Sequence, residues 1–109
     1  MSAGETGAEA TKTLFEAIAL RKIADAVYNR SEFRFAPYIL YTRHDELFVD
    51  GVTVERNGQP PRELKLGTFK LAGLTVKGLR DGPFRIETLF DPHAEKYQGV
   101  TLFAVEAGN

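Results

Sequence analysis

The sequence of 109 residues contains no cysteine. The chain therefore has no disulfide framework and no thiolate to act as a nucleophile or metal ligand, a composition that suits the reducing cytoplasm. It also lacks any apolar run near the roughly 18 residues of a membrane-spanning helix, and its N-terminus lacks the basic and apolar segments of a secretory signal. We therefore expect a cytoplasmic protein that does not bind a membrane.

An excess of charge of one sign is missing as well. The 14 Lys and Arg residues are balanced by 15 Asp and Glu residues, so the formal net charge is −1. Tight binding of duplex DNA depends on a basic face that neutralises many phosphates, and we therefore expect no tight duplex binding. The hydrophobic fraction of 43% is that of an ordinary globular protein, and the length allows one domain.

Residues suited to enzyme chemistry are scarce. The only serines are Ser2 and Ser31, and neither lies in the Gly-x-Ser-x-Gly turn of a hydrolase. Asp91, His93 and Glu95 alternate as metal ligands can, but at a helix start this spacing points the side chains in different directions, and a capped surface turn explains it better. We therefore expect a protein that is not an enzyme, with no catalytic residue, no metal and no cofactor.

The chain changes character after its first ten residues. Residues 1–10 are small, polar and acidic, so we expect a flexible tail there and a single domain over residues 11–109. Leu14, Phe15 and Ile18 are spaced to share one face of a helix, which should run from about Thr11 to Leu20.

Alternating apolar residues between Gly, Pro and Asn turns predict short strands in the rest of the chain. Pro37 should lie at an edge or a bend of its strand, because it lacks an N–H group. A change of alternation between Leu66 and Phe69 predicts a β-bulge at Gly67. The expected strands cover residues 23–28, 33–42, 47–54, 64–71, 74–76, 84–90 and 100–105. One helix followed by many short strands predicts a small barrel or sandwich.

A series of short motifs between about residues 17 and 79 follows the order and spacing of a known family. A helix that ends in Ala-Ile precedes a basic strand that ends in tyrosine, and the next strand carries a proline followed three residues later by a leucine. An apolar tripeptide and a glycine come next, and a Phe-x-Leu segment closes the series. The residues are Ala17-Ile18, Arg21-Lys22, Tyr28, Pro37, Leu40, Leu47-Phe48-Val49, Gly51 and Phe69-Lys70-Leu71. In this succession the chain resembles the WYL domain family, which has Trp-Tyr-Leu at the place of Leu47-Phe48-Val49.

The resemblance implies a fold that is mainly β: an N-terminal helix followed by a small antiparallel β-barrel of the SH3-like or Sm-like type, here with additional C-terminal strands. Members of the family are regulatory modules of bacteria that bind nucleic acid or small, often negatively charged ligands. We therefore expect a stand-alone, non-enzymatic module for ligand sensing or regulation, whose partner is a small anionic ligand or a short single-stranded nucleic-acid segment. Gly73 stands where the family commonly has an arginine of its ligand site.

Four residues are the candidate ligand-binding residues: Tyr38, Arg43, Lys65 and Lys70. The lysines lie near the place where the family has basic residues, and with Arg43 they can line an anion site when a barrel closes. The alternative is that they are solvated charges on edge strands. Strand parity places Tyr38 on the face opposite to Phe35, so it is the better candidate for a surface aromatic that stacks a base. The alternative for the aromatic residues as a group is that they fill the core.

Unpaired strand edges predict self-association. We expect two exposed edge strands, the strand that contains Pro37 and the apolar strand over residues 100–105. The unpaired backbone groups of such edges need to be covered, and a twofold interface between two copies covers them. We therefore expect a homo-oligomer, in the first place a dimer. The alternative function is a homo-oligomerising interaction module without a ligand.

Overall fold

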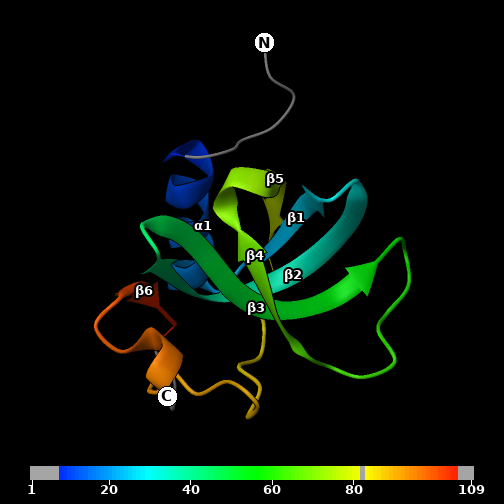
Figure 1. Ribbon diagram of the computed structural model, residues 1–109. Coiled ribbons are helices and arrows are strands. Elements are labelled where there is room, and N and C mark those ends of the chain that lie inside the picture. Colours follow the sequence, from blue (N-terminus) through cyan, green and yellow to red (C-terminus); the bar gives the residue numbers. More distant parts are fainter. Residues whose placement is uncertain (1–7, 82, 106–109) are drawn as a thin grey trace.

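The computed structural model describes residues 8–81 and 83–105 of the chain. In this part of the chain one α-helix, six strands and two single-turn 3₁₀ helices form the fold (Figure 1). The elements, in chain order, are α1 (Ala8–Leu20), β1 (Ile23–Tyr28), β2 (Ser31–Arg43), β3 (Glu46–Arg56), β4 (Leu66–Lys70), η1 (Leu71–Gly73), β5 (Leu74–Arg80), η2 (Glu95–Tyr97) and β6 (Thr101–Ala104). None of the helices in these residues is long and apolar enough to cross a membrane.

All six strands belong to one antiparallel sheet in the order β4-β3-β2-β1-β5, with β6 paired to β2 off this path. The long strand β2 is the centre of the sheet. Its residues 31–35 pair with β1, its residues 39–41 pair with β6 along the same edge, and β3 follows most of the other edge. Tight turns with positive φ at Asn29, Arg30, His44 and Asp45 connect β1, β2 and β3 as successive hairpins. The expected class, mainly β with an N-terminal helix, is confirmed.

The sheet is curled, but hydrogen bonds do not close it into a barrel within the described residues. The edge strands β4 and β5 are joined only by the three residues of η1, so opposite edges of the sheet meet at this corner. The ring of Tyr28 in β1 lies 5.2 Å from that of Phe69 in β4, and the Tyr28 hydroxyl accepts a hydrogen bond from the N–H of Lys70 at 3.2 Å. Side chains therefore link two strands, β1 and β4, that are separated by β2 and β3 in the sheet.

A bend at Pro37 lets β2 serve as the centre of the sheet. The register with β3 skips Tyr38 between Pro37 and Ile39, so β2 carries one extra residue there. Gly51 lies opposite Pro37, and a Cβ at Gly51 would lie 2.3 Å from the carbonyl oxygen of Ala36. Only glycine permits the two backbones to approach so closely. Of the two expectations for Pro37, the bend is right and the edge position is wrong.

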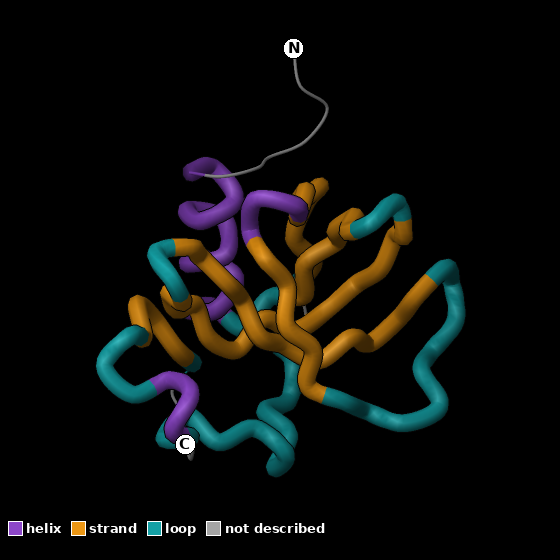
Figure 2. The backbone as a smooth tube through the Cα atoms, viewed as in Figure 1, coloured by secondary structure: helices purple, strands orange, loops and turns teal. Residues whose placement is uncertain are grey.

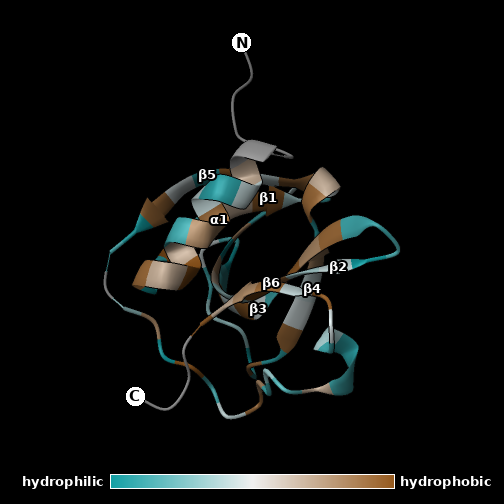
Figure 3. Cartoon of the chain, turned by 90° about the vertical axis from the view of Figure 1, so that its left-hand side faces the viewer, coloured by the Kyte–Doolittle hydropathy of each residue, from teal (hydrophilic) through white to brown (hydrophobic). Residues whose placement is uncertain are grey.

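Two aromatic clusters and the helix supply the core. In the first cluster Phe33, Phe35 and Phe69 lie with ring centroids 4.9 to 5.3 Å apart. The second cluster joins β2 to the C-terminal part of the chain and contains Tyr38, Tyr41, Phe84, Phe90 and Tyr97. The helix α1 is amphipathic, and the polar and apolar residues alternate along it in Figure 3. Its buried side chains are Ala10, Leu14, Ala17 and Ile18.

The segment after β5 departs most from expectation. Residues 84–90, expected as a strand, form no strand; they run beneath the sheet in the view of Figure 2 without pairing to it. Their alternation arises because Phe84 and Phe90 pack on the ring of Tyr38. The Tyr38 hydroxyl also donates a hydrogen bond to the carbonyl of Arg85 at 2.7 Å and accepts one from the N–H of Glu87 at 2.9 Å. The Tyr38 side chain therefore holds the backbone of residues 84–90, where strand pairing was expected.

Two smaller differences concern the ends of elements. No bulge occurs at Gly67, because β4 pairs in regular register with β3 from Leu66 to Lys70 and Leu64 lies outside the strand. The helix begins at Ala8, three residues before the expected start. The rest of the expected tail, residues 1–7, lies outside the described residues.

Candidate functional site

Two clusters of polar side chains are built around carboxylates in the middle of strands. The Asp25 cluster contains Asp25 of β1, Arg34 of β2, Glu55 of β3 and Arg80 of β5. The Asp50 cluster contains Asp50 of β3, Tyr41 of β2, and Lys96 and Tyr97 of η2. They differ in their access to water, and this difference separates a site for recognition from a structural contact.

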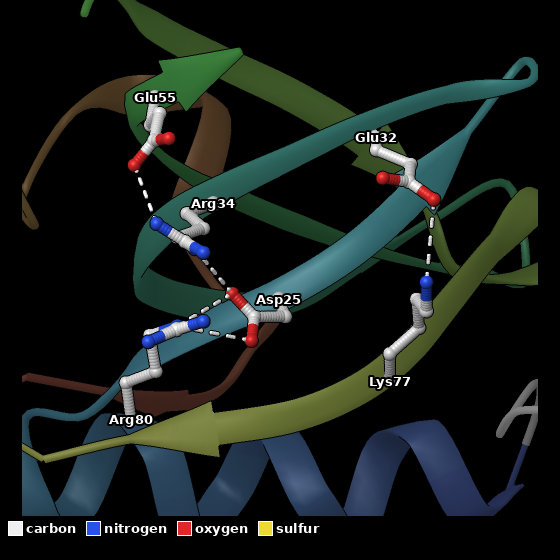
Figure 4. Close-up of polar contacts among 6 residues, drawn as sticks. All are labelled: Asp25, Glu32, Arg34, Glu55, Lys77 and Arg80. Atoms are coloured by element: carbon white, nitrogen blue, oxygen red, sulfur yellow. Dashed lines mark hydrogen bonds and ion pairs between the residues drawn. The ribbon is translucent and has the colours of Figure 1, made fainter. Parts of the chain in front are cut away.

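The strand register assembles the Asp25 cluster. Asp25 lies directly opposite Arg34, and Arg34 lies directly opposite Glu55, so the three side chains form a row across β1, β2 and β3. The Nε of Arg34 donates to Oδ1 of Asp25 at 2.8 Å, and its Nη1 donates to Oε1 of Glu55 at 2.5 Å (Figure 4). The Nε of Arg80 lies 3.1 Å from both carboxylate oxygens of Asp25. One carboxylate therefore orients two guanidinium groups.

A second ion pair widens this charged area. Between Asp25 and Ala26 the register with β5 shifts, which leaves Lys77 as an extra residue, and its Nζ lies 3.3 Å from Oε2 of Glu32. The six charged groups line a hollow of about 300 Å³ together with Ala26, Phe33, Asn57 and Gly58. Three cations and three carboxylates give the hollow no net charge, so its binding capacity depends on geometry.

The contacts of the two arginines leave donors for a ligand. Hydrogen bonding to Asp25, with a further contribution from the charge of Glu55, raises the pKa of Arg34, which stays a cation. Arg80 uses only Nε on Asp25, and its Nη groups have no hydrogen-bond partner among the described residues. The side chain of Arg80 is 51% exposed, so these donors are open to solvent. A guanidinium fork held in one orientation is suited to bind a carboxylate or phosphate through two parallel hydrogen bonds.

The carboxylate of the Asp50 cluster is sealed from water, whereas the Lys96 side chain that contacts it is 42% exposed. Asp50 is fully buried, and its carboxylate accepts hydrogen bonds from the hydroxyls of Tyr41 at 2.7 Å and Tyr97 at 2.5 Å and from Nζ of Lys96 at 2.9 Å. Burial, and then the neighbouring Asp50 carboxylate, raises the pKa of both tyrosines, so each keeps its proton and remains a donor. Among the described residues no buried side-chain nitrogen or oxygen lacks a hydrogen-bond partner. The cluster fixes η2 to β2 and β3 and offers no open position to a substrate.

The four residues expected to bind the ligand do not converge. Arg43 is exposed and lies opposite Glu46 in the register, and Nζ of Lys70 lies 2.7 Å from Oε1 of the same Glu46. This contact raises the pKa of Lys70. Lys65 precedes the other end of β4, roughly 16 Å along an extended chain from Lys70, and lines a separate hollow of about 580 Å³ with Arg56 and Pro60. Arg43 and Lys70 therefore flank one carboxylate, while Lys65 lies apart from them.

The expectation that Tyr38 is a surface aromatic is wrong, because its ring is fully buried. Parity alone does not reveal that residues 84–90 cover this part of β2. The sequence also contained a signal for the Asp25 cluster that the motifs did not use: Asp25 interrupts an apolar strand, and Arg34 lies between Phe33 and Phe35. A charge at the centre of a strand needs a partner on the neighbouring strand, and here Asp25 and Arg34 are each other's partner.

No protein-family model matches the chain, and neither a curated protein nor a solved structure is significantly similar to it. In the described residues no three His, Asp or Glu side chains are arranged to hold a metal ion. His93 and Asp91 instead form a local turn, in which the N–H of His93 donates to Oδ1 of Asp91 at 2.9 Å.

Proposed function

We propose that this chain is a stand-alone, non-enzymatic regulatory module of the WYL type that binds a small anionic ligand in the hollow of the Asp25 cluster. The motif succession between residues 17 and 79 supports the family assignment. The short η1 connection between the two edge strands supports the finer proposal that the sheet is a barrel of the SH3-like or Sm-like type.

One observation carries the ligand site: Asp25 holds Arg34 and Arg80 through their Nε atoms, and the Nη groups of Arg80 remain unused by the described residues. Two cations oriented by a shared carboxylate are prepared for an anion, because the side-chain entropy of ordering them is lost before the ligand arrives. The neighbouring carboxylates keep the hollow neutral. We therefore expect weak, salt-sensitive binding with a dissociation constant on the order of micromolar or above.

The ligand chemistry is that of a carboxylate or phosphate of limited size, since the hollow measures about 300 Å³. A short single-stranded nucleic acid offers the same phosphate group and is the second source of this chemistry. Titration with inorganic phosphate, adenosine monophosphate and a short oligothymidylate, followed by backbone amide chemical shifts at low and moderate salt, distinguishes a free anion from a strand. Tighter binding of the oligonucleotide alone would favour nucleic acid.

The matched variants are Arg80→Gln and Arg43→Gln, which remove the same charge from exposed positions on different strands. We expect Arg80→Gln to weaken phosphate binding about tenfold or more, while Arg43→Gln leaves it unchanged. If Arg43→Gln weakens binding and Arg80→Gln does not, the ligand lies near Arg43 and Lys70, and the Asp25 site is wrong. Thermal unfolding of both variants checks that each retains its fold.

Self-association through β6 is a second candidate function. β6 pairs with β2 on one side and with no other described strand, and Leu102 within it is 47% exposed. An apolar edge strand can pair with its copy across a twofold axis. Sedimentation of the wild type and Leu102→Lys measures this: a dimer that the lysine variant dissociates supports the candidate. A species of 12.1 kDa at high micromolar concentration rejects it.

A further inference from the structure

An apolar pocket of about 220 Å³ lies beside the hollow of the Asp25 cluster. It is lined by side chains of three strands, by the residues after β5, and by Leu64 from the loop before β4. Ala36 and Val52 are buried in it, whereas Leu64 is 41% exposed, one of the large apolar side chains that solvent reaches. The hydrogen bonds of Tyr38 to the backbone of residues 85 and 87 hold the wall of the pocket that the residues after β5 form.

The strand register makes this pocket the neighbour of the charged hollow on one face of the sheet. Arg34 and Ala36 are two residues apart in β2, as are Ile23 and Asp25 in β1, so each pair points to the same face. Ala36 lies opposite Val52, and Ile23 lies opposite Arg80. The row of Ile23, Ala36 and Val52 therefore lies one repeat of the pleat, about 7 Å along the strands, from the row of Asp25, Arg34 and Glu55.

Neither hollow alone has the character of a ligand site for a mid-sized molecule. The apolar pocket, at about 220 Å³, is smaller than the roughly 300 to 1,000 Å³ that such sites occupy. The charged hollow has donors but few apolar walls. Together the two provide an apolar wall and a few oriented polar groups, the combination that small-molecule sites share.

We propose that the two hollows form one site for an amphipathic monoanion, with its carboxylate on Arg80 and Arg34 and a short hydrocarbon body against the partly exposed side chains of Ile23, Val54 and Leu64. This inference rests on the proposed function, because the head of the ligand occupies the anion site assigned there. A fully polar anion would leave the exposed parts of Ile23, Val54 and Leu64 uncovered, and a neutral hydrocarbon would leave the guanidinium donors unused.

The test is a titration with acetate, butanoate, hexanoate and octanoate, followed by the backbone amide shifts of Ile23, Asp25 and Ala36. Each buried methylene is expected to tighten binding about three- to fourfold until the pocket is filled. Hexanamide, which has the same body without charge, should bind at least tenfold more weakly than hexanoate. Inorganic phosphate serves as the anion without an apolar body.

Three variants separate head from body. Leu64→Ser should flatten the dependence on chain length and leave acetate binding unchanged, because Leu64 lines only the apolar pocket. Its matched control is Leu102→Ser, the same change at a similarly exposed leucine on β6, which should leave the affinity for all four alkanoates unchanged. Arg80→Gln should weaken all four alkanoates by a similar factor and keep the chain-length dependence.

The outcomes distinguish this inference from the proposed function. If all four alkanoates and phosphate bind with similar affinity and Arg80→Gln weakens them, the joint site is wrong and the anion site stands. If the chain-length dependence is present but Arg80→Gln has no effect, the head does not contact Arg80, and both are wrong. Absence of binding by every probe also overturns both.

Discussion

The Asp25 and Asp50 clusters are both built on a carboxylate that accepts hydrogen bonds, but they differ in how far water reaches that carboxylate. Each carboxylate accepts several hydrogen bonds from side chains of other elements, but the side chain of Asp25 is 29% exposed and that of Asp50 is fully buried. In the sealed cluster two of the three donors are uncharged tyrosine hydroxyls, and in the open cluster the donors are guanidinium groups. A buried charge binds its partners because water cannot replace them, whereas exposed ion pairs exchange with solvent or with a ligand. The first arrangement therefore suits stability and the second suits recognition.

The largest effect is expected from Asp50→Ala. The change removes the acceptor of three hydrogen bonds and leaves two buried hydroxyls and the ammonium of Lys96 without it. We expect the free energy of unfolding to fall by about 3 to 5 kcal/mol. Urea unfolding followed by circular dichroism measures the change. A loss below about 1 kcal/mol would mean that water reaches the cluster and that the contrast with Asp25 does not hold.

Tyr97→Phe removes one donor of the sealed cluster and keeps the ring. Since the lost hydrogen bond is made to a charged group, the free energy of unfolding should fall by about 1.5 to 3 kcal/mol. The control is Tyr28→Phe, whose hydroxyl accepts a hydrogen bond from a neutral backbone N–H at 3.2 Å and should cost about 0.5 to 1 kcal/mol. Equal losses in the two variants would contradict a special role for the buried carboxylate.

Alkaline pH should weaken the sealed cluster. Burial and the nearby Asp50 raise the pKa of Tyr97 in the folded chain above its ordinary value of about 10. The folded state therefore holds this proton more tightly than the unfolded state, and the resulting stability is present below about pH 10 and is lost as the pH rises above it. Urea midpoints between pH 8 and 11 should fall less steeply in Tyr97→Phe than in the wild type; parallel curves would exclude Tyr97 as a source of the dependence.

The smallest effect on stability is expected from Asp25→Ala. The ion pairs of Asp25 are partly exposed and screened, so the free energy of unfolding should change by about 1 kcal/mol or less. High salt should reduce this change further, while the loss in Asp50→Ala should persist. A loss as large as that of Asp50→Ala would make the Asp25 cluster a structural element. Anion binding, in contrast, should fall clearly in Asp25→Ala because both arginines lose their orientation.

The strands that form local hairpins could be predicted from the sequence, and the contacts of the C-terminal part could not. Residues 23–28 alternate and end at an Asn-Arg turn, so β1 has the expected bounds. Residues 84–90 alternate as well, yet their alternation reflects burial of Phe84 and Phe90 on Tyr38 and no ladder. Periodicity reports that one side of a segment is buried, and it does not identify what covers it.

The candidate site was missed for a related reason. Motif positions directed attention to Arg43, Lys65 and Lys70, whereas the Asp25 cluster depends on the register of four strands. Arg34 pairs with Glu55, and the next residue of β2 pairs with Thr53, so the register shifts and Val54 is an extra residue in β3. This shift has no signal in the sequence. Without it, the partner of Arg34 on β3 could not be named.

The tyrosine contacts of the C-terminal segment also imply an order of assembly. β1, β2 and β3 are joined by tight turns and find their partners nearby in the chain, but Tyr38 meets Arg85 across 47 residues and Asp50 meets Tyr97 across the same separation. Contacts between distant residues form late, since a long loop has to be closed first. The hairpins of β1, β2 and β3 should therefore form before residues 83–105 dock, and residues 83–105 should be the first part to detach when the protein opens.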